Sequence, residues 1–198
     1  MNSDLTLPPT YLITPEPPAG ASFDGYLAQL ERCLDGGARL VQLRAKTLDP
    51  ARYAELAVRV RASCLRHGAR LLLNTPAAAL DTLDADGVHL SSTRLLDCTH
   101  RPLPAGKLLS VACHDRQQVQ HANSIGADWL TLSPVLPTAT HPDATPLGWE
   151  RFQALASLSR IPVYAMGGMS AAHLERARAA GAYGIAAIRA LWHAADGG

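Results

Sequence analysis

The sequence predicts a compact, single-domain α/β protein of the (β/α)₈ (TIM) barrel class, and three observations carry this prediction. Short β-prone runs alternate with helical patterns eight times along 198 residues. Most of these runs are continuously apolar, as parallel strands are when both faces of their sheet are buried. Polar residues follow many of the runs, where the carboxyl ends of barrel strands form the catalytic face. A doubly wound open sheet is the alternative, but no G-x-G-x-x-G motif follows the first run.

The composition limits the classes of partner. Hydrophobic residues make up 47% of the chain and charged residues 18%, which is typical of a globular domain. The net charge of +1 favours neither nucleic acid nor an anionic membrane as a partner. No apolar run reaches the roughly 18 residues of a membrane span, and the first residues do not resemble a signal peptide, so we expect a cytoplasmic protein. The four cysteines are widely spaced, which predicts neither a zinc site nor a disulfide framework.

The chain divides into a proline-ended leader at residues 1–9, the barrel at residues 10–192 and a short tail at residues 193–198. The strands are expected at residues 10–14, 39–45, 70–74, 87–90, 108–114, 129–135, 162–166 and 184–189. Each of these runs is apolar or β-prone and is bounded by glycine, proline or polar residues.

The helices follow the strands in order. The first, at residues 23–35, carries leucines at helical spacing and stops at Gly36-Gly37. Asp49 caps the second, Pro50 occupies its first turn, and it ends near His67-Gly68. Only a short helical turn is expected after the fourth strand. The remaining helices are expected after Thr75-Pro76, from Asp115 to Gly126, from Trp149 to Leu158 and from Ser170 to Gly181.

Polar groups and glycines gather at the carboxyl ends of the predicted strands. They are Gln42, Arg44, Lys46, Asn74, His89, His114, Thr138, Thr140, His141, Gly167, Gly168 and Arg189. Taken singly, each has an ordinary explanation: a surface charge, a helix cap or a hydrogen-bonded structural histidine. Because the strand ends of a barrel meet on one rim, their convergence favours a binding site.

The chemistry of this rim predicts anionic ligands. Gly167-Gly168 lets the backbone approach a ligand, and the loops after strands seven and eight commonly bind phosphate in barrels. Arg44 offers a planar fork to phosphate oxygens, and Lys46 a compact charge. We therefore expect two anionic groups, one near strands two and three and one near strands seven and eight. This arrangement predicts one or two phosphorylated substrates.

These residues occur in motifs that resemble thiamine phosphate synthases, whose superfamily includes the TenI-type thiazole tautomerases. The similarity spans about Thr10 to Trp192 and is closest to the synthase-like domains joined to Nudix hydrolases. The motifs are Gln42-Leu43-Arg44-x-Lys46, Leu73-Asn74, Ala85-Asp86-Gly87-Val88-His89-Leu90, Gly126-Ala127-Asp128, Ser133-Pro134-Val135-Leu136-Pro137-Thr138-x-Thr140, Pro146-Leu147-Gly148, Pro162-Val163, Gly167-Gly168-Met169 and Ala180-Gly181-Ala182-Tyr183-Gly184-Ile185-Ala186.

The resemblance implies a transferase that joins a hydroxymethylpyrimidine diphosphate to a thiazole phosphate and releases pyrophosphate. It assigns the diphosphate to Arg44 and Lys46, which with His141 are the expected catalytic residues. The expected substrate-binding residues are Gln42, Asn74, His89, Thr138, Thr140, Gly167, Gly168, Ile188 and Arg189.

The chain departs from the family at the metal site. The family's two magnesium-binding aspartates correspond to Thr75 and to the segment containing Arg94, so Mg²⁺ is expected to bind weakly or not at all. The family serine after strand five is Ala112, the lysine after Thr-x-Thr is His141, and the serine of strand eight is Arg189. Arg94 and Arg189 would then supply the metal's charge, or the site would have kept phosphate binding without transfer.

Two other functions stay open. A thiazole phosphate tautomerase needs an acid–base histidine, and Pro134 stands where the family has one, so His114 or His141 would have to act from a different position. A non-catalytic phosphate-binding domain that acts with a Nudix hydrolase partner is the second. A homo-oligomer is also considered, but the sequence does not determine the oligomeric state.

Overall fold

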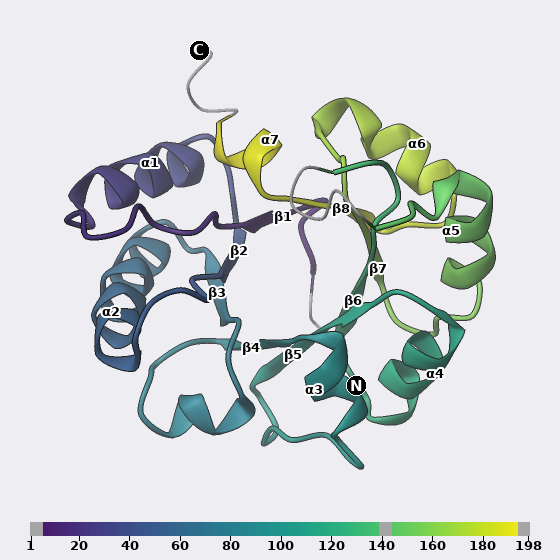
Figure 1. Cartoon of the computed structure of the whole chain (residues 1–198), viewed down its shortest axis with the longest axis horizontal. Coiled ribbons are helices and arrows are strands. Elements are labelled where there is room, and N and C mark those ends of the chain that lie inside the picture. Colours follow the sequence, from purple (N-terminus) through teal and green to yellow (C-terminus); the bar gives the residue numbers. More distant parts are fainter. Residues whose placement is uncertain (1–5, 139–143, 194–198) are drawn as a thin grey trace.

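The computed structural model describes residues 6–138 and 144–193. Its eight parallel strands follow one another in sequence order and close into a barrel, which confirms the predicted fold (Figure 1). The strands are β1 (Thr10–Ile13), β2 (Leu40–Leu43), β3 (Arg70–Leu73), β4 (Gly87–Leu90), β5 (Leu108–Cys113), β6 (Trp129–Leu132), β7 (Val163–Met166) and β8 (Gly184–Ala187).

Helices surround the barrel (Figure 1). They are α1 (Asp24–Asp35), α2 (Pro50–Arg66), the 3₁₀-helix η1 (Ala77–Asp81), α3 (Ser92–Leu96), α4 (Arg116–Ser124), α5 (Gly148–Ala156), the 3₁₀-helix η2 (Ala171–His173), α6 (Leu174–Ala179) and α7 (Arg189–Trp192). Within the described ranges, no helix is both long and apolar enough to cross a membrane.

Strand pairing excludes the open-sheet alternative, because β1 pairs with both β2 and β8. Leu12 lies opposite Val41 of β2 and opposite Ala187 of β8. With no free edge, every strand places its carboxyl end on the same rim. Closure of the barrel therefore brings residues from distant parts of the sequence to one site.

Alternation along each strand divides the core into two parts. One set of residues faces the surrounding helices, and the other fills the barrel interior. Tyr11 lies at the centre of the interior, with its ring 5.8 Å from that of Trp129 and 5.7 Å from that of Tyr164. This aromatic layer closes the barrel below the carboxyl-end rim.

Several boundaries differ from the prediction. The sixth strand ends at Leu132 instead of Val135, and the Ser133–Pro134 peptide bond that follows it is cis. The eighth strand was expected to end at Arg189 and to lead directly into a tail. It ends at Ala187, and Arg189 is the first residue of the short helix α7. Trp192 of α7 packs against Tyr26 of α1, with ring centroids 4.9 Å apart.

Residues next to β1 close the opposite end of the barrel. Leu7 is buried, and the Tyr164 hydroxyl donates a hydrogen bond of 2.6 Å to the carbonyl of Pro8. The carbonyl of Pro9 accepts a 3.0 Å hydrogen bond from the backbone N–H of Ile185. Part of the segment expected to be a leader is therefore packed against the barrel.

Candidate functional site

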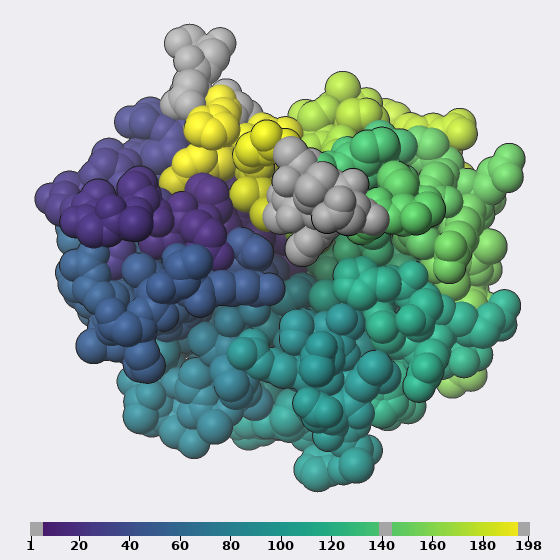
Figure 2. All heavy atoms as spheres, viewed as in Figure 1, coloured from purple at the N-terminus to yellow at the C-terminus, as the bar shows by residue number. Residues whose placement is uncertain are grey.

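A cavity of about 1450 Å³ opens at the carboxyl ends of the strands. Figure 2 views the molecule along the barrel, where the surface is hollowed near the centre between the blue and teal segments. The predicted site residues that line it are Gln42, Arg44, Lys46, Asn74, His89, His114, Thr138, Gly167, Gly168, Ile188 and Arg189. The predicted residues Thr140 and His141 lie outside the described part of the chain.

Arg44 and Lys46 are held in place by Glu16, which the sequence analysis missed. Arg44 Nη1 donates a 3.0 Å hydrogen bond to Glu16 Oε1, and the same oxygen accepts from the backbone N–H of Lys46 at 3.1 Å. Glu16 Oε2 accepts from the Thr47 hydroxyl at 3.0 Å. One carboxylate thus orders the loop after β2. No local motif relates the first strand's loop to the second's, so only the fold reveals this contact.

Lys46 stands in a crowded cationic environment. Its pKa is lowered, mainly by burial and then by the charge of Arg44, while Glu16 opposes the shift and Arg94 adds to it. Three cations therefore act on one another around the ends of β2 and β4. An anionic ligand at this position would relieve that repulsion.

The amides of the predicted pyrimidine site form a fixed chain. Asn74 Nδ2 donates a 2.8 Å hydrogen bond to Gln42 Oε1, and Gln42 Nε2 donates a 3.0 Å hydrogen bond to Tyr11 Oη. Gln42 is 1% exposed, and burial raises the pKa of the Tyr11 phenol, which therefore stays protonated. These contacts orient the side chains before a ligand binds, which reduces the ordering cost of binding.

His89 lies on the cavity floor as a neutral ring. Its Nδ1 is 2.9 Å from the Ser110 hydroxyl. Burial, with a smaller contribution from the charge of Lys46, lowers the pKa of His89 to about 3. His89 therefore serves as a neutral hydrogen-bonding group and not as an acid or base near pH 7.

Gly167 and Gly168 are required by the packing of two loops. Both have positive φ angles, 93° and 69°. A Cβ atom on Gly167 would lie 2.7 Å from Pro134 Cα, and one on Gly168 would lie 2.7 Å from Leu136 Cβ. The pair thus allows the loop after β7 to contact the loop after β6 closely, and both loops line the cavity.

Arg151 is a cavity residue that the sequence analysis did not identify. It lies on α5 and lines the same cavity as Arg189 at the start of α7. Among the residues that the structure describes, no carboxylate forms an ion pair with either arginine. An arginine on an amphipathic helix is ordinarily a solvated surface charge. The sequence around Arg151 therefore did not indicate that its side chain lines the cavity.

His114 has a defined orientation on the rim. Its Nδ1 is 2.8 Å from the carbonyl oxygen of Ser133, so that nitrogen carries the proton and donates. This leaves Nε2 of the neutral ring as the acceptor. His114 is therefore a group that could accept a proton from a ligand in the cavity.

The described residues do not fit a magnesium ion. Among the described residues the buried hydroxyl of Thr75 has no hydrogen-bond partner, and the positive charge of Arg94 acts on Lys46 in the region where a cation would bind. The cavity-lining residues within the described ranges include neither aspartate nor glutamate. The same ranges contain no cluster of three or more His, Cys, Asp or Glu side chains suited to a metal.

Comparison with known proteins identifies the family. The family model described as thiamine monophosphate synthase matches residues 10–191. A putative thiamine-phosphate synthase 2 of Aquifex aeolicus (strain VF5) is 34% identical over 184 residues, covering 93% of this chain and 97% of that protein. A putative thiamine-phosphate synthase of Geobacter sulfurreducens (strain ATCC 51573 / DSM 12127 / PCA) is 39% identical over 183 residues, covering 91% and 85%.

A solved structure supports the fold. The thiamine phosphate pyrophosphorylase from Pyrococcus furiosus superposes with a TM-score of 0.73 at 22% identity, covering 94% of this chain and 91% of that one. The family model and the two relatives each span most of the sequence, and the structure shares the barrel. The chain belongs to the thiamine monophosphate synthase family.

Proposed function

We propose that this protein joins a hydroxymethylpyrimidine diphosphate to a thiazole phosphate and releases pyrophosphate. The observation that carries the proposal is the presence of two separate cationic groups in one cavity. Arg44 and Lys46 follow β2, whereas Arg151 and Arg189 lie beside the loops after β6, β7 and β8. Two anionic substrates would each find a charged subsite there, and membership of the family supports this pair of substrates.

The first subsite would hold the pyrimidine diphosphate. Arg44 and Lys46 supply its charge, and the Glu16 contacts fix the loop that carries them. Gln42 and Asn74 lie deeper, where their hydrogen-bonded amides would line the pyrimidine ring. In this proposal the pyrimidine ring would lie toward the floor and the diphosphate toward the rim.

The second subsite would hold the thiazole phosphate. Gly167 and Gly168 expose backbone at the end of β7, and Arg189 begins α7 beside Ile188. Thr138 lines the same part of the cavity. We keep Thr140 and His141 as proposed contacts of this substrate and its neighbouring pyrophosphate, on the basis of the resemblance.

The reaction requires charge stabilisation and placement of the two rings. The C–O bond between the pyrimidine methylene and the diphosphate breaks, and its electron pair leaves with pyrophosphate. The thiazole nitrogen then donates its lone pair to the resulting methyl cation and forms the C–N bond. Arg44 and Lys46 would stabilise the charge that develops on the leaving group, which is the step that fixed cations accelerate most.

The proposal is tested by mixing the purified protein with both substrates and measuring thiamine phosphate by chromatography. We expect product at enzymatic rates only when both substrates are present. Tight binding of both substrates without turnover would contradict the transferase and favour the non-catalytic binding domain. Reactions that lack one substrate provide the control.

The orientation of His114 supports a thiazole phosphate tautomerase as a second candidate. Nδ1 is fixed by Ser133, so Nε2 is available to move a proton on a ligand. A tautomerase would convert a thiazole phosphate tautomer without any pyrimidine substrate. Its activity should then fall at least tenfold in His114→Gln, as expected when an acid–base group is removed. Unchanged conversion would eliminate His114 from this role.

The proposed partner follows from the resemblance, and the proposed compartment from the sequence. We propose a Nudix hydrolase as a partner, tested by co-purification of the two tagged proteins. A homo-oligomer is a separate proposal, for which light scattering gives the mass in solution. We also propose a cytoplasmic location, which cell fractionation would test.

A further inference from the structure

Thr131 has a buried hydroxyl that nothing in the fold explains. It lies on β6, two residues after Trp129, and so shares the face of the strand that points into the barrel. The residue is 0% exposed and lines the cavity, yet its Oγ1 has no hydrogen-bond partner among the residues that the structure describes. A buried hydroxyl without a partner is unfavourable, because it has lost its water without replacement.

Other polar groups of the cavity floor are satisfied within the protein. Gln42 forms hydrogen bonds with Tyr11 and Asn74, and His89 forms one with Ser110. Thr131 thus differs from the buried polar residues around it. Trp129 Nε1 is also unpartnered, but Trp129 lies in the layer below and does not line the cavity.

The residues beside Thr131 offer it no polar contact from the neighbouring strand ends. Its pairing partner on β5 is Ala112, which also lines the cavity. Its pairing partner on β7 is Tyr164, whose hydroxyl donates to the carbonyl of Pro8 at the opposite end of the barrel. Met166 lines the cavity at the end of β7. The hydroxyl therefore stands alone on an apolar side of the floor. In the closed barrel β6 lies across from β2, which carries Gln42.

A flat heterocycle on this floor would meet polar groups on opposite sides. Gln42 and Asn74 would contact one edge, and Thr131 would contact the other. A pyrimidine carries ring nitrogens that accept hydrogen bonds, and a threonine hydroxyl has one hydrogen to donate. The Thr131 hydroxyl can thus donate a hydrogen bond to a ring nitrogen of this class of ligand.

We infer that Thr131 Oγ1 donates a hydrogen bond to a ring nitrogen of the pyrimidine substrate. This inference rests on the proposed function, because it names a contact within the same site. The role is positioning and recognition: the hydroxyl holds the ring and takes no part in bond breaking. No motif in the sequence distinguishes Thr131 from the buried residues around it.

The test compares Thr131→Val, which replaces the hydroxyl with a methyl group, with Thr131→Ser, which keeps the hydroxyl. Calorimetry with hydroxymethylpyrimidine diphosphate should show affinity roughly tenfold lower in Thr131→Val and close to wild type in Thr131→Ser, the loss expected for one hydrogen bond. Pyrophosphate alone should bind both variants as it binds the wild type. Thr131→Val should also melt no lower than the wild type, because it removes an unpaired buried hydroxyl.

Unchanged affinity of Thr131→Val for the pyrimidine diphosphate would overturn the inference, and so would an equal loss of pyrophosphate affinity. Steady-state kinetics add a second readout. The KM for the pyrimidine diphosphate should rise in Thr131→Val while the KM for the thiazole phosphate stays within about twofold. The binding measurement needs no turnover. It therefore tests Thr131 even if the wild-type protein proves not to be a transferase.

Discussion

The two ends of the barrel differ in how far their arginines are paired with carboxylates. At the amino ends of the strands, arginines meet carboxylates: Arg61 Nη1 lies 2.7 Å from Asp86 Oδ2, and Arg101 Nη2 lies 2.7 Å from Asp128 Oδ2. At the carboxyl-end rim, Arg151 and Arg189 have no carboxylate partner among the described residues. The first arrangement stabilises the fold, whereas the second leaves positive charge available for a ligand.

The same set of aspartate contacts occurs twice at the amino ends of the strands, which form the closed end of the barrel. Asp86 Oδ2 also accepts from the backbone N–H of Leu71 at 2.7 Å, and Asp128 Oδ2 accepts from that of Leu109 at 2.7 Å. In each case the aspartate directly precedes a strand, β4 or β6. Its carboxylate accepts a hydrogen bond from the backbone of the neighbouring strand, β3 or β5, and pairs with an arginine that is not on a strand. Paired charges at the amino ends thus stabilise the fold. The rim instead combines one paired arginine, Arg44 with Glu16, with Arg151 and Arg189, which lack a carboxylate partner among the described residues.

The largest effect is expected at the rim. Arg44→Ala should lower kcat/KM for the transferase reaction by about 10³-fold, because it removes a fixed cation from the leaving diphosphate. Steady-state assays of thiamine phosphate formation measure this change. Arg59→Ala is the matched control, since Arg59 pairs with the exposed Asp24 on the helical surface. An Arg44→Ala enzyme with wild-type kinetics would show that the diphosphate site is misplaced.

A change at the closed end should affect stability and not turnover. Asp128→Ala should lower the free energy of unfolding by about 2 kcal/mol, because it removes the ion pair of Arg101 and the acceptor of the Leu109 N–H. Urea denaturation gives this value, and kcat at low temperature should stay within about twofold of wild type. A large loss of kcat in a folded variant would contradict the conclusion that the closed end serves stability and the rim serves the reaction.

Arg151 tests whether the second cationic group binds substrate. Arg151→Ala should raise the KM for the thiazole phosphate about tenfold and leave the KM for the pyrimidine diphosphate nearly unchanged. Arg160→Ala serves as a control, because Arg160, between α5 and β7, is exposed and does not line the cavity. Equal KM values for Arg151→Ala and wild type would remove Arg151 from the site.

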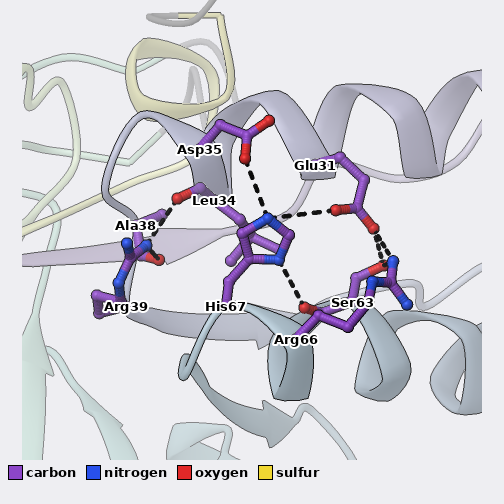
Figure 3. A network of polar contacts seen from close by, with 8 residues as sticks. All are labelled: Glu31, Leu34, Asp35, Ala38, Arg39, Ser63, Arg66 and His67. Atoms are coloured by element: carbon purple, nitrogen blue, oxygen red, sulfur yellow. Dashed lines mark hydrogen bonds and ion pairs between the residues drawn. The ribbon is translucent and has the colours of Figure 1, made fainter.

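The smallest effect is expected in a network between α1 and α2, shown in Figure 3. His67 Nδ1 lies 2.9 Å from the Ser63 carbonyl, and His67 Nε2 lies 3.1 Å from Asp35 Oδ1. The Ser63 carbonyl, followed by Asp35 and Glu31, raises the pKa of His67 above its usual 6.5. Both ring nitrogens are thus used best when the imidazole is protonated.

The sign of the pH dependence follows from that shift. A raised pKa in the folded state contributes stability that is fully present below about pH 6.5 and is lost as the pH rises through the higher folded value. Melting temperatures of wild type should therefore fall slightly relative to His67→Gln between pH 6 and pH 8. Parallel melting curves across this range would show that the network does not respond to protonation.

The sequence predicted the strands well because apolar runs between glycine and proline are local features. It missed α7, since four residues, Arg189–Trp192, carry too little helical periodicity to be recognised. At the site, the polar residues that directly follow strands were predicted. Glu16, Arg151 and Thr131 were not, because their positions at the rim and the cavity depend on how distant segments meet, which no spacing along the chain encodes.

The most direct test of the account is the metal dependence of the transferase reaction. The rim supplies cations from the protein, and the described residues that line its cavity include no aspartate or glutamate to bind Mg²⁺. Thiamine phosphate formation should therefore continue in excess EDTA at a rate within about twofold of that with millimolar Mg²⁺. A reaction that EDTA abolishes and Mg²⁺ restores would contradict the claim that arginine and lysine side chains alone stabilise the leaving pyrophosphate.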